Sequence, residues 1–337
     1  MQNAIELRQN VMPRILAGRK LGKIIIIIAS MLIFKLEAHA QDPIFSQYYA
    51  NPLYLNPAFA GSAHCARMTF NYRNQWPALT GQFITTSAAF DKYVCHVGGV
   101  GVLLTNDRAG EGTIITNNAS LIYSAIQPIN RFYSISAGFQ GTYAEKRVDW
   151  SKLTFGDMID PRHGFVFQTA EVPGDNVARY FDMSAGGMLY SNRLFMGVAV
   201  HHLAQPDEHL QTGPSPLPRK YTGHIGVTIK AGESTKGEDV IISPNILYQQ
   251  QQDFKQLNLG CYVSKGPVTG GFWYRNKDSF IILVGIQKGL LKFGYSYDVT
   301  ISKLSMRTAG SHEISLQMTL ECKRCKKSFR TVSCPSF

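Results

Sequence analysis

Charged residues are scarce in this chain of 337 residues, since Asp, Glu, Lys and Arg together make up 17%. Soluble domains usually carry about 25% charged residues. Disordered chains combine high charge with few aromatics, whereas this chain is 11% aromatic. Beyond the first 40 residues it also lacks any run of about 18 apolar residues, which excludes a helical membrane bundle. An aromatic-rich and charge-poor chain of this kind favours an all-β protein.

The first 40 residues have the composition of a secretory signal peptide. A basic stretch ending at Lys23 precedes the apolar run 24–34, and Ala38-His39-Ala40 has the form of a cleavage site. A membrane anchor is the alternative, but this apolar run is too short to span a bilayer. We therefore expect a cleaved signal peptide over 1–40 and an exported mature chain.

Apolar and polar residues alternate along the body of the chain. In 312–320, for example, Ile314, Leu316 and Met318 alternate with polar residues. A period of two is the pattern of a β-strand whose two faces meet different surroundings. Fourteen such segments are predicted: 64–75, 82–94, 96–106, 112–126, 131–146, 177–190, 193–204, 218–231, 238–249, 254–264, 266–276, 279–287, 289–300 and 309–320.

These strands are long enough to cross a bilayer when tilted, which takes roughly nine to eleven residues. An exported chain with an even number of long alternating strands is typical of an outer-membrane barrel. With both termini in the periplasm, the longest connections, 147–176 and 205–217, fall on the outer side, as expected of such barrels. The sequence therefore predicts a 14-stranded antiparallel transmembrane outer-membrane β-barrel over 64–320. In its last strand, the side chains expected to face the lumen are Glu313, Ser315 and Gln317.

The segment 41–63 differs from the strands that follow it. It is rich in Phe and Tyr but is interrupted by Asn51-Pro52 and Asn56-Pro57, which is too broken for a lipid-facing strand. We interpret it as a plug, or as a lid at the periplasmic mouth of the barrel. A plain periplasmic linker is the alternative.

Cysteine is uncommon, with six residues in the chain. Cys65 and Cys95 lie at the periplasmic ends of the first two predicted strands, and an exported protein can form disulfides, so they are a candidate pair. Cys261 belongs to an apolar strand face and is expected to be a free thiol. A tail disulfide is expected among Cys322, Cys325 and Cys334.

The tail 321–337 is the most basic part of the mature chain. Five like charges within eight positions favour a solvated segment in the periplasm, and the disordered tail is one interpretation. The three cysteines indicate more order than that. We therefore expect a basic surface that binds a periplasmic partner, formed by Lys323, Arg324, Lys326, Lys327 and Arg330.

Several motifs together resemble one known family. The mature chain begins with QDPIFSQYYANPLYLNPAFAGS at 41–62, and YRNQW follows at 72–76, GYSYD at 294–298 and SHEISL at 311–316. In order and spacing these resemble the PorP/SprF family of Bacteroidetes outer-membrane proteins, over nearly all of the mature chain. The resemblance implies a role in type IX secretion and gliding motility. It also implies two kinds of partner: a secreted adhesin or enzyme with a C-terminal sorting domain, and periplasmic secretion or peptidoglycan-associated components.

Other functions have less support. The chain has no G-x-S-x-G motif and no phosphate-binding loop that opens a helix, so we expect no enzyme activity and no cofactor. His201, His202, His209 and Asp207 match no metal-site spacing, and we expect no metal there. Binding of nucleic acid is not expected of an exported chain without a basic–aromatic motif. Two alternatives stay open: a passive porin or small-solute channel, and a barrel enzyme acting on membrane lipid.

Overall fold

The structure is a computed structural model that describes residues 41–160, 162–170, 175–210, 214–233, 239–301 and 309–320. From Pro43 onward, the described residues form one compact unit, to which the elements below belong. Among the described residues, no helix is long and apolar enough to span a membrane.

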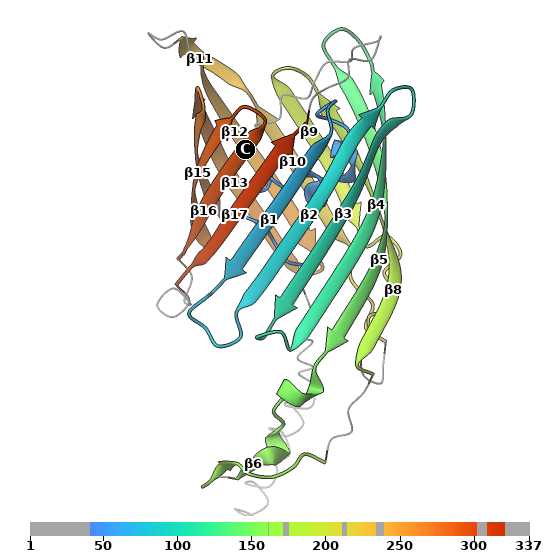
Figure 1. Ribbon diagram of the computed structural model, residues 1–337, viewed down its shortest axis with the longest axis vertical. Coiled ribbons are helices and arrows are strands. Elements are labelled where there is room, and N and C mark those ends of the chain that lie inside the picture. Colours follow the sequence, from blue (N-terminus) through green and yellow to red (C-terminus); the bar gives the residue numbers. More distant parts are fainter. Residues whose placement is uncertain are drawn as a thin grey trace, which may run out of the picture. The chain divides into compact units, whose positions relative to one another are not determined.

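Antiparallel strands form a closed barrel of fourteen strand positions (Figure 1). Strands β10 and β11 are separated only by Thr228 and both pair with β12, so together they occupy one position. The strands of the barrel are β1 (Arg67–Gln75), β2 (Phe83–Val94), β3 (Gly98–Ala109), β4 (Ile114–Pro128), β5 (Ser134–Val148), β8 (Val177–Tyr190), β9 (Leu194–His201), β10 (Lys220–Val227), β11 (Ile229–Glu233), β12 (Asp239–Gln251), β13 (Phe254–Lys265), β14 (Val268–Arg275), β15 (Ser279–Lys288), β16 (Leu291–Thr300) and β17 (Ser311–Thr319).

The barrel closes where its first strand pairs with its last. Strand β1 is antiparallel to β17 over its whole length, from Arg67 opposite Thr319 to Gln75 opposite Ser311. Every other neighbouring pair in the barrel is antiparallel and consecutive along the chain, apart from the long β5–β8 connection. The predicted all-β barrel of fourteen antiparallel strands is therefore confirmed.

The two faces of the strands have the predicted environments. In β17, Glu313 is 0% exposed and faces the interior, whereas Ile314 is 39% exposed and faces outward. The predicted facing of Ser315, Leu316 and Gln317 is confirmed in the same way. Most strand boundaries differ from the predicted ones by one to three residues. The third strand, for example, was expected to end at 106 but continues to Ala109, because its last residues still pair with β2 and β4.

The two ends of the barrel differ in their connections. At one end β2 and β3 are joined by residues 95–97, and β8 and β9 by residues 191–193. The other end carries 202–219 and the long β5–β8 connection with η2 (Trp150–Lys152), η3 (Gly156–Met158), β6 (Ile159–Asp160) and β7 (Gly164–Phe165). Long loops lie outside in outer-membrane barrels, so we name these the inner end and the outer end.

Candidate functional site

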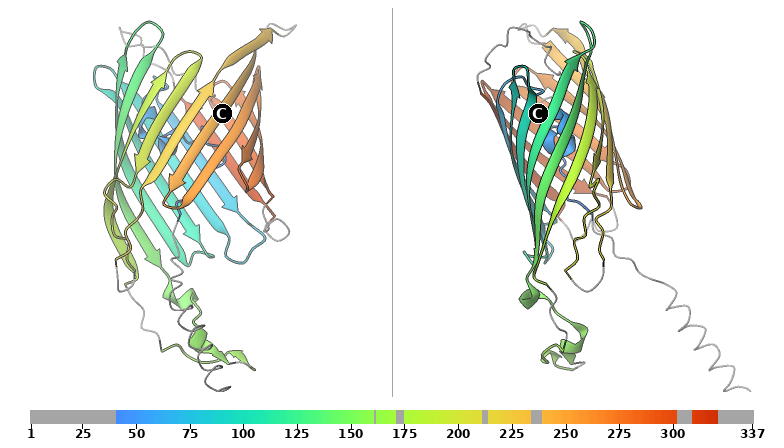
Figure 2. Two further views of the ribbon diagram at one scale, coloured as in Figure 1. Left: turned by 180° about the vertical axis from the view of Figure 1, so that it is seen from behind. Right: turned by 90° about the vertical axis from the view of Figure 1, so that its right-hand side faces the viewer.

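Residues 43–62, the lumen segment, lie inside the barrel (Figure 2, blue). They contain α2 (Pro52–Leu55) and η1 (Pro57–Phe59), two short helices that each begin with proline. Proline suits a first helical position because its missing N–H would have no helical partner there. Asn56 caps the second helix by accepting a hydrogen bond from the Ala58 N–H at 2.9 Å. The local sequence thus folds the lumen segment into compact turns instead of a strand.

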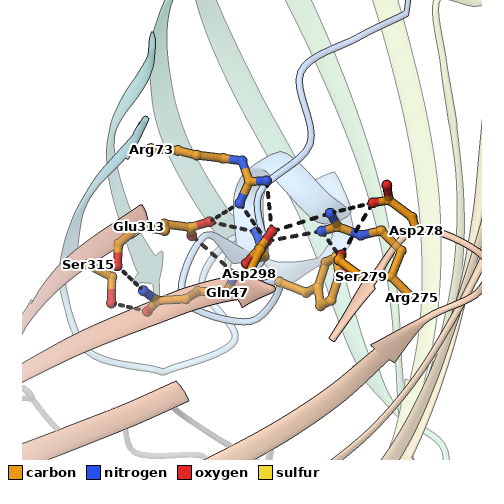
Figure 3. A network of polar contacts seen from close by, with 10 residues as sticks. Gln47, Arg73, Arg275, Asp278, Ser279, Asp298, Glu313 and Ser315 are labelled. Atoms are coloured by element: carbon orange, nitrogen blue, oxygen red, sulfur yellow. Dashed lines mark hydrogen bonds and ion pairs between the residues drawn. The ribbon is translucent and has the colours of Figure 1, made fainter. Parts of the chain in front are cut away.

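The first part of the lumen segment lies against a buried charge network, formed by Arg73, Arg275, Asp298 and Glu313 (Figure 3). These side chains come from β1, β14, β16 and β17, and all four are buried. The Arg73 guanidinium lies 2.9 Å from the Asp298 carboxylate and 3.3 Å from that of Glu313. Arg275 lies 3.3 Å from Asp298. Two positive and two negative charges therefore meet inside the lumen, and Arg275 also pairs with the partly exposed Asp278 at 3.2 Å.

Ser46 and Gln47 complete the hydrogen bonds of this network. The Ser46 N–H donates to one carboxylate oxygen of Glu313 at 2.6 Å, and the Gln47 N–H donates to the other at 3.1 Å. The Ser46 hydroxyl donates to Asp298 at 2.6 Å and accepts from both arginines. Hydrogen bonds to ionised groups are stronger than neutral ones. Ionic hydrogen bonds thus hold the first part of the lumen segment to four strands near the outer end.

Aromatic rings fill the middle of the lumen. Tyr48 packs edge-on against Trp273 of β14 with ring centroids 4.9 Å apart, and Tyr49 packs edge-on against Phe195 of β9 at 5.3 Å. Phe59 stacks on the His224 ring of β10 at 5.4 Å. Such pairs stabilise by about 0.5–1.5 kcal/mol beyond the burial of their area. These rings join the lumen segment to β9, β10 and β14.

On the β3–β9 side, the lumen segment lies against a row of small side chains, the small-residue belt. Its members face one another across neighbouring strands in one register row: Gly99, Ser124, Gly138, Gly186 and Ala199. A Cβ atom added to Gly138 would stand 2.4 Å from the Ala58 backbone nitrogen. One added to Gly99 would stand 2.0 Å from the Ala60 carbonyl oxygen, and one added to Gly186 would stand 2.0 Å from the Asn56 side chain. A methyl group is therefore excluded at the three glycines of this belt.

Hydrogen bonds fix the position of the lumen segment on the belt. The Ser136 hydroxyl donates to the Ala58 carbonyl at 2.6 Å, and the Ser124 hydroxyl donates to the same oxygen at 3.3 Å. The Asn56 amide donates to the backbone carbonyls of Val198 at 3.1 Å and Gly187 at 3.3 Å. Residues 56–61 are thus matched to the belt in both shape and hydrogen bonding.

A second buried ion pair holds the point where the lumen segment joins the barrel. Arg67, the first residue of β1, makes two hydrogen bonds to Asp91 of β2, at 2.8 and 3.0 Å. The other Asp91 contact is the Gly61 N–H, which donates to it at 2.9 Å. The lumen segment therefore runs from the charge network near the outer end to this pair at the inner end.

The predicted cysteine sites are only partly within the described residues. Cys65 and Cys95 are both disulfide-bonded, and their pairing with each other stays a prediction. Cys261 is free, as expected. The tail residues Cys322, Cys325, Cys334, Lys323, Arg324, Lys326, Lys327 and Arg330 lie outside the described residues.

The histidines near the outer end make pairwise contacts. His202 lies 2.8 Å from Asp182, and His209 lies 3.3 Å from Asp207. Within the described residues, no group of three or more His, Cys, Asp or Glu side chains is arranged to hold a metal ion.

Sequence reasoning did not predict the charge network. Glu313 was expected to face the lumen, but its partners were not identified. The available signal is that Arg73, Asp298 and Glu313 each lie in a motif that carried the family resemblance, YRNQW, GYSYD and SHEISL, and that each is the buried member of an alternating strand.

The fold and the occupied lumen define a transmembrane β-barrel of the outer-membrane class. The family model of the type IX secretion system membrane protein PorP/SprF matches residues 37–318, and the chain belongs to this family.

Solved structures with a similar fold are distant in sequence. The Ralstonia pickettii toluene transporter TbuX is 11% identical, with a TM-score of 0.45 over 80% of this chain and 93% of that chain. The Acinetobacter baumannii outer membrane protein Omp33 is 8% identical, with a TM-score of 0.43 over 77% and 100%. The CymD monoaromatic hydrocarbon channel is 10% identical, with a TM-score of 0.42 over 80% and 93%. No curated protein matches the chain.

Proposed function

We propose that the protein is a closed docking barrel of the type IX secretion system, which holds a secreted protein with a C-terminal sorting domain at the cell surface. The observation that carries this proposal is the burial of the lumen segment: residues 45–62 are all buried apart from the half-buried Tyr54. A segment fixed by buried ion pairs at both ends acts as a plug, which a passive channel does not need. The same packing leaves little space for a substrate, and we propose no enzyme activity.

The outer loops offer a surface for the secreted protein. In the β5–β8 connection Phe165, Val166 and Phe167 are all more than half exposed, and Ile159 is nearly so. Clustered exposed apolar side chains are uncommon unless they meet a partner or a membrane. Their place at the outer end supports an interface with exported protein.

Ion conductance separates the docking barrel from the channel alternative. The mature protein and a variant lacking residues 43–62 are each reconstituted in a planar bilayer. We expect the complete protein to conduct few ions and the deletion variant to conduct steadily, because its lumen is no longer filled. Steady conductance by the complete protein would overturn the proposal in favour of a passive porin.

A second experiment addresses the partners. Deletion of 321–337 removes the basic tail and leaves every described strand intact. We expect this variant to insert into the outer membrane, while the secreted protein fails to reach or remain on the surface. The contact should weaken as salt is raised, because exposed charges are screened. Normal surface display by the truncated protein would contradict docking through the tail. Measurable turnover of membrane lipid by the purified barrel would instead favour the enzyme alternative.

A further inference from the structure

A polar row crosses the outward face of the barrel between β2 and β8. In register, Thr86 faces Asn106, Asn106 faces Asn117, Asn117 faces Glu145 and Glu145 faces Arg179. The Asn106 amide donates to Asn117 at 2.6 Å. A row of polar side chains on a lipid-facing surface is costly in hydrocarbon. Because the row lies three residues from the outer ends of β2, β3, β4 and β5, it belongs at the level of the lipid headgroups.

A groove of about 480 Å³ begins at this row, whose Thr86, Asn106, Asn117 and Glu145 line its outer edge, and extends toward the bilayer centre. Its floor contains Ala88, Leu104 and Ala119, which are neighbours across β2, β3 and β4. Phe70 of β1 and Tyr143 of β5 stand at its two sides and are both exposed. The groove therefore has a polar outer edge and an apolar floor between two aromatic walls, on the strands that face the viewer in Figure 1.

Three guanidinium groups stand above the groove. Arg108 belongs to the next row outward, and so does Arg147, two strands away, with Ile115 between them. Arg147 and Arg179 both bind the Glu145 carboxylate, at 3.2 and 2.9 Å. Arg108 bonds to the neutral Asn106 side chain at 3.1 Å, and among the described residues no carboxylate pairs with it. Glu145 thus pairs with two of the three arginines, and all three guanidiniums are exposed.

The opposite half of the barrel carries aromatic side chains near its outer end. There, Tyr221 and Tyr248 face outward near the outer ends of β10 and β12, and both are exposed. Such aromatic residues form the girdle at the membrane interface. Three residues from their outer ends, β2, β3, β4 and β5 instead carry the polar row, so aromatic residues are replaced by polar ones where the arginines gather.

We propose that this groove, with Arg108, Arg147 and Arg179 above it, binds a phosphorylated lipid of the outer leaflet. An acyl chain lies in the apolar groove between Phe70 and Tyr143, and the phosphate accepts hydrogen bonds from the guanidiniums. Arginine suits this task because its planar group forms paired hydrogen bonds with phosphate oxygens. Basic pockets beside an apolar surface are the usual form of a headgroup site. The site occupies the outside of the barrel, so it does not depend on the closed lumen.

The test measures lipid binding to the purified mature protein in detergent by native mass spectrometry. The probes are diphosphorylated lipid A and the same lipid after removal of its phosphates. We expect the phosphorylated form to bind about tenfold more tightly or better, which corresponds to about 1.4 kcal/mol. The variant with Arg108→Gln, Arg147→Gln and Arg179→Gln should lose this preference. Lys255→Gln, which removes an exposed cation at the outer end of β13, is the control and should keep it.

A second pair of variants tests the groove itself. Ala119→Phe fills the groove and should weaken binding of both lipid forms by about tenfold, since the acyl chain loses its place. Leu121 lies on the same face of β4 but outside the groove, so Leu121→Phe should leave binding of both lipid forms unchanged. Equal binding of both lipid forms by the wild type, or an unchanged preference in the triple arginine variant, would overturn the proposal. Copurification of another protein with the wild type but not with the triple arginine variant would also overturn the proposal, because that protein and not a lipid would then occupy the site.

Discussion

The two ends of the lumen segment are held by different physics. Ser46 and Gln47 bind buried charges of four strands, whereas residues 56–61 lie on a belt whose three glycines leave no room for a methyl group. A buried charge network is sensitive to the loss of one member, because the remaining charges are then unpaired. A close-packed surface is sensitive to added volume instead. The comparison teaches that the same segment can be released in two ways, by unbalancing charge at one end or by adding volume at the other.

Removal of Arg73 should have the largest effect. Arg73→Met leaves Asp298 and Glu313 buried beside a single arginine, and breaking a buried pair in this way costs about 3–5 kcal/mol. We expect lower stability in urea and protease cleavage within residues 43–50. The matched control is Lys230→Met, which breaks an exposed pair with Asp239 and should cost less than about 1 kcal/mol.

The charge-balanced variant sharpens this result. Arg73→Met combined with Glu313→Met removes one charge of each sign, so the cost should be smaller than the sum of the two single changes. The measurement is the free energy of unfolding of the two single variants and the double variant. If the loss in the double variant equals the sum of the two single losses, Arg73 and Glu313 do not act as a pair, and the contribution assigned to charge balance is wrong.

Added volume at the belt is the second test. Gly138→Val would place side-chain atoms on the Pro57–Ala58 backbone, and overpacking of this kind costs about 1–3 kcal/mol. We expect the lumen segment to leave the belt and ion conductance to rise. Gly141→Val on the same strand is the control, since a Cβ at Gly141 has nothing within 4 Å. Equal conductance of the two variants would show that the belt does not position the segment.

The barrel could be predicted from the sequence because lumen and lipid select different side chains at every second residue. The small-residue belt could not be predicted in this way. Gly99, Gly138 and Gly186 form a row only through the register of β3, β4, β5 and β8. Register between distant strands depends on the closed barrel and not on local pattern.

The charge network was hidden for the same reason. Alternation placed Glu313 in the lumen, but its contact with Arg73 arises from closure between β1 and β17, and Arg73 meets Asp298 225 positions away in the chain. The lumen segment has no readable period, since its aromatic residues Phe45, Tyr48, Tyr49, Tyr54 and Phe59 contact several different walls or one another. Neither a strand nor a helix pattern describes such a segment.

Two serines allow the two kinds of contact to be compared directly: Ser46 in the charge network and Ser136 of β5 beside the belt. Ser46→Ala removes hydrogen bonds to ionised groups, which contribute about 1.5–3 kcal/mol, whereas Ser136→Ala removes a bond to the neutral Ala58 carbonyl, which contributes about 1 kcal/mol. We expect Ser46→Ala to lower the free energy of unfolding more than Ser136→Ala. The reverse order, measured by urea titration of the two variants, would show that the belt and not the charge network dominates.

The smallest effect is expected for charge outside the barrel, where solvent screens it. In the β5–β8 connection the Ala170 N–H and the Thr169 hydroxyl bind the Asp157 carboxylate, and these hydrogen bonds hold its pKa below the ordinary value of 3.8. A carboxyl whose pKa is lowered by folding stabilises the loop above its unfolded pKa. That stabilisation is lost as the pH falls through the folded pKa. Amide hydrogen exchange at Ala170 should therefore be slow at pH 7, after correction for intrinsic rates, and faster below about pH 3.8. In Asp157→Asn this pH dependence should disappear while the barrel strands stay protected. Protection of Ala170 that does not change with pH in the wild type would contradict the role of the ionised carboxylate. In that case, the ionic contacts that stabilise this fold would be the buried ones at the first part of the lumen segment.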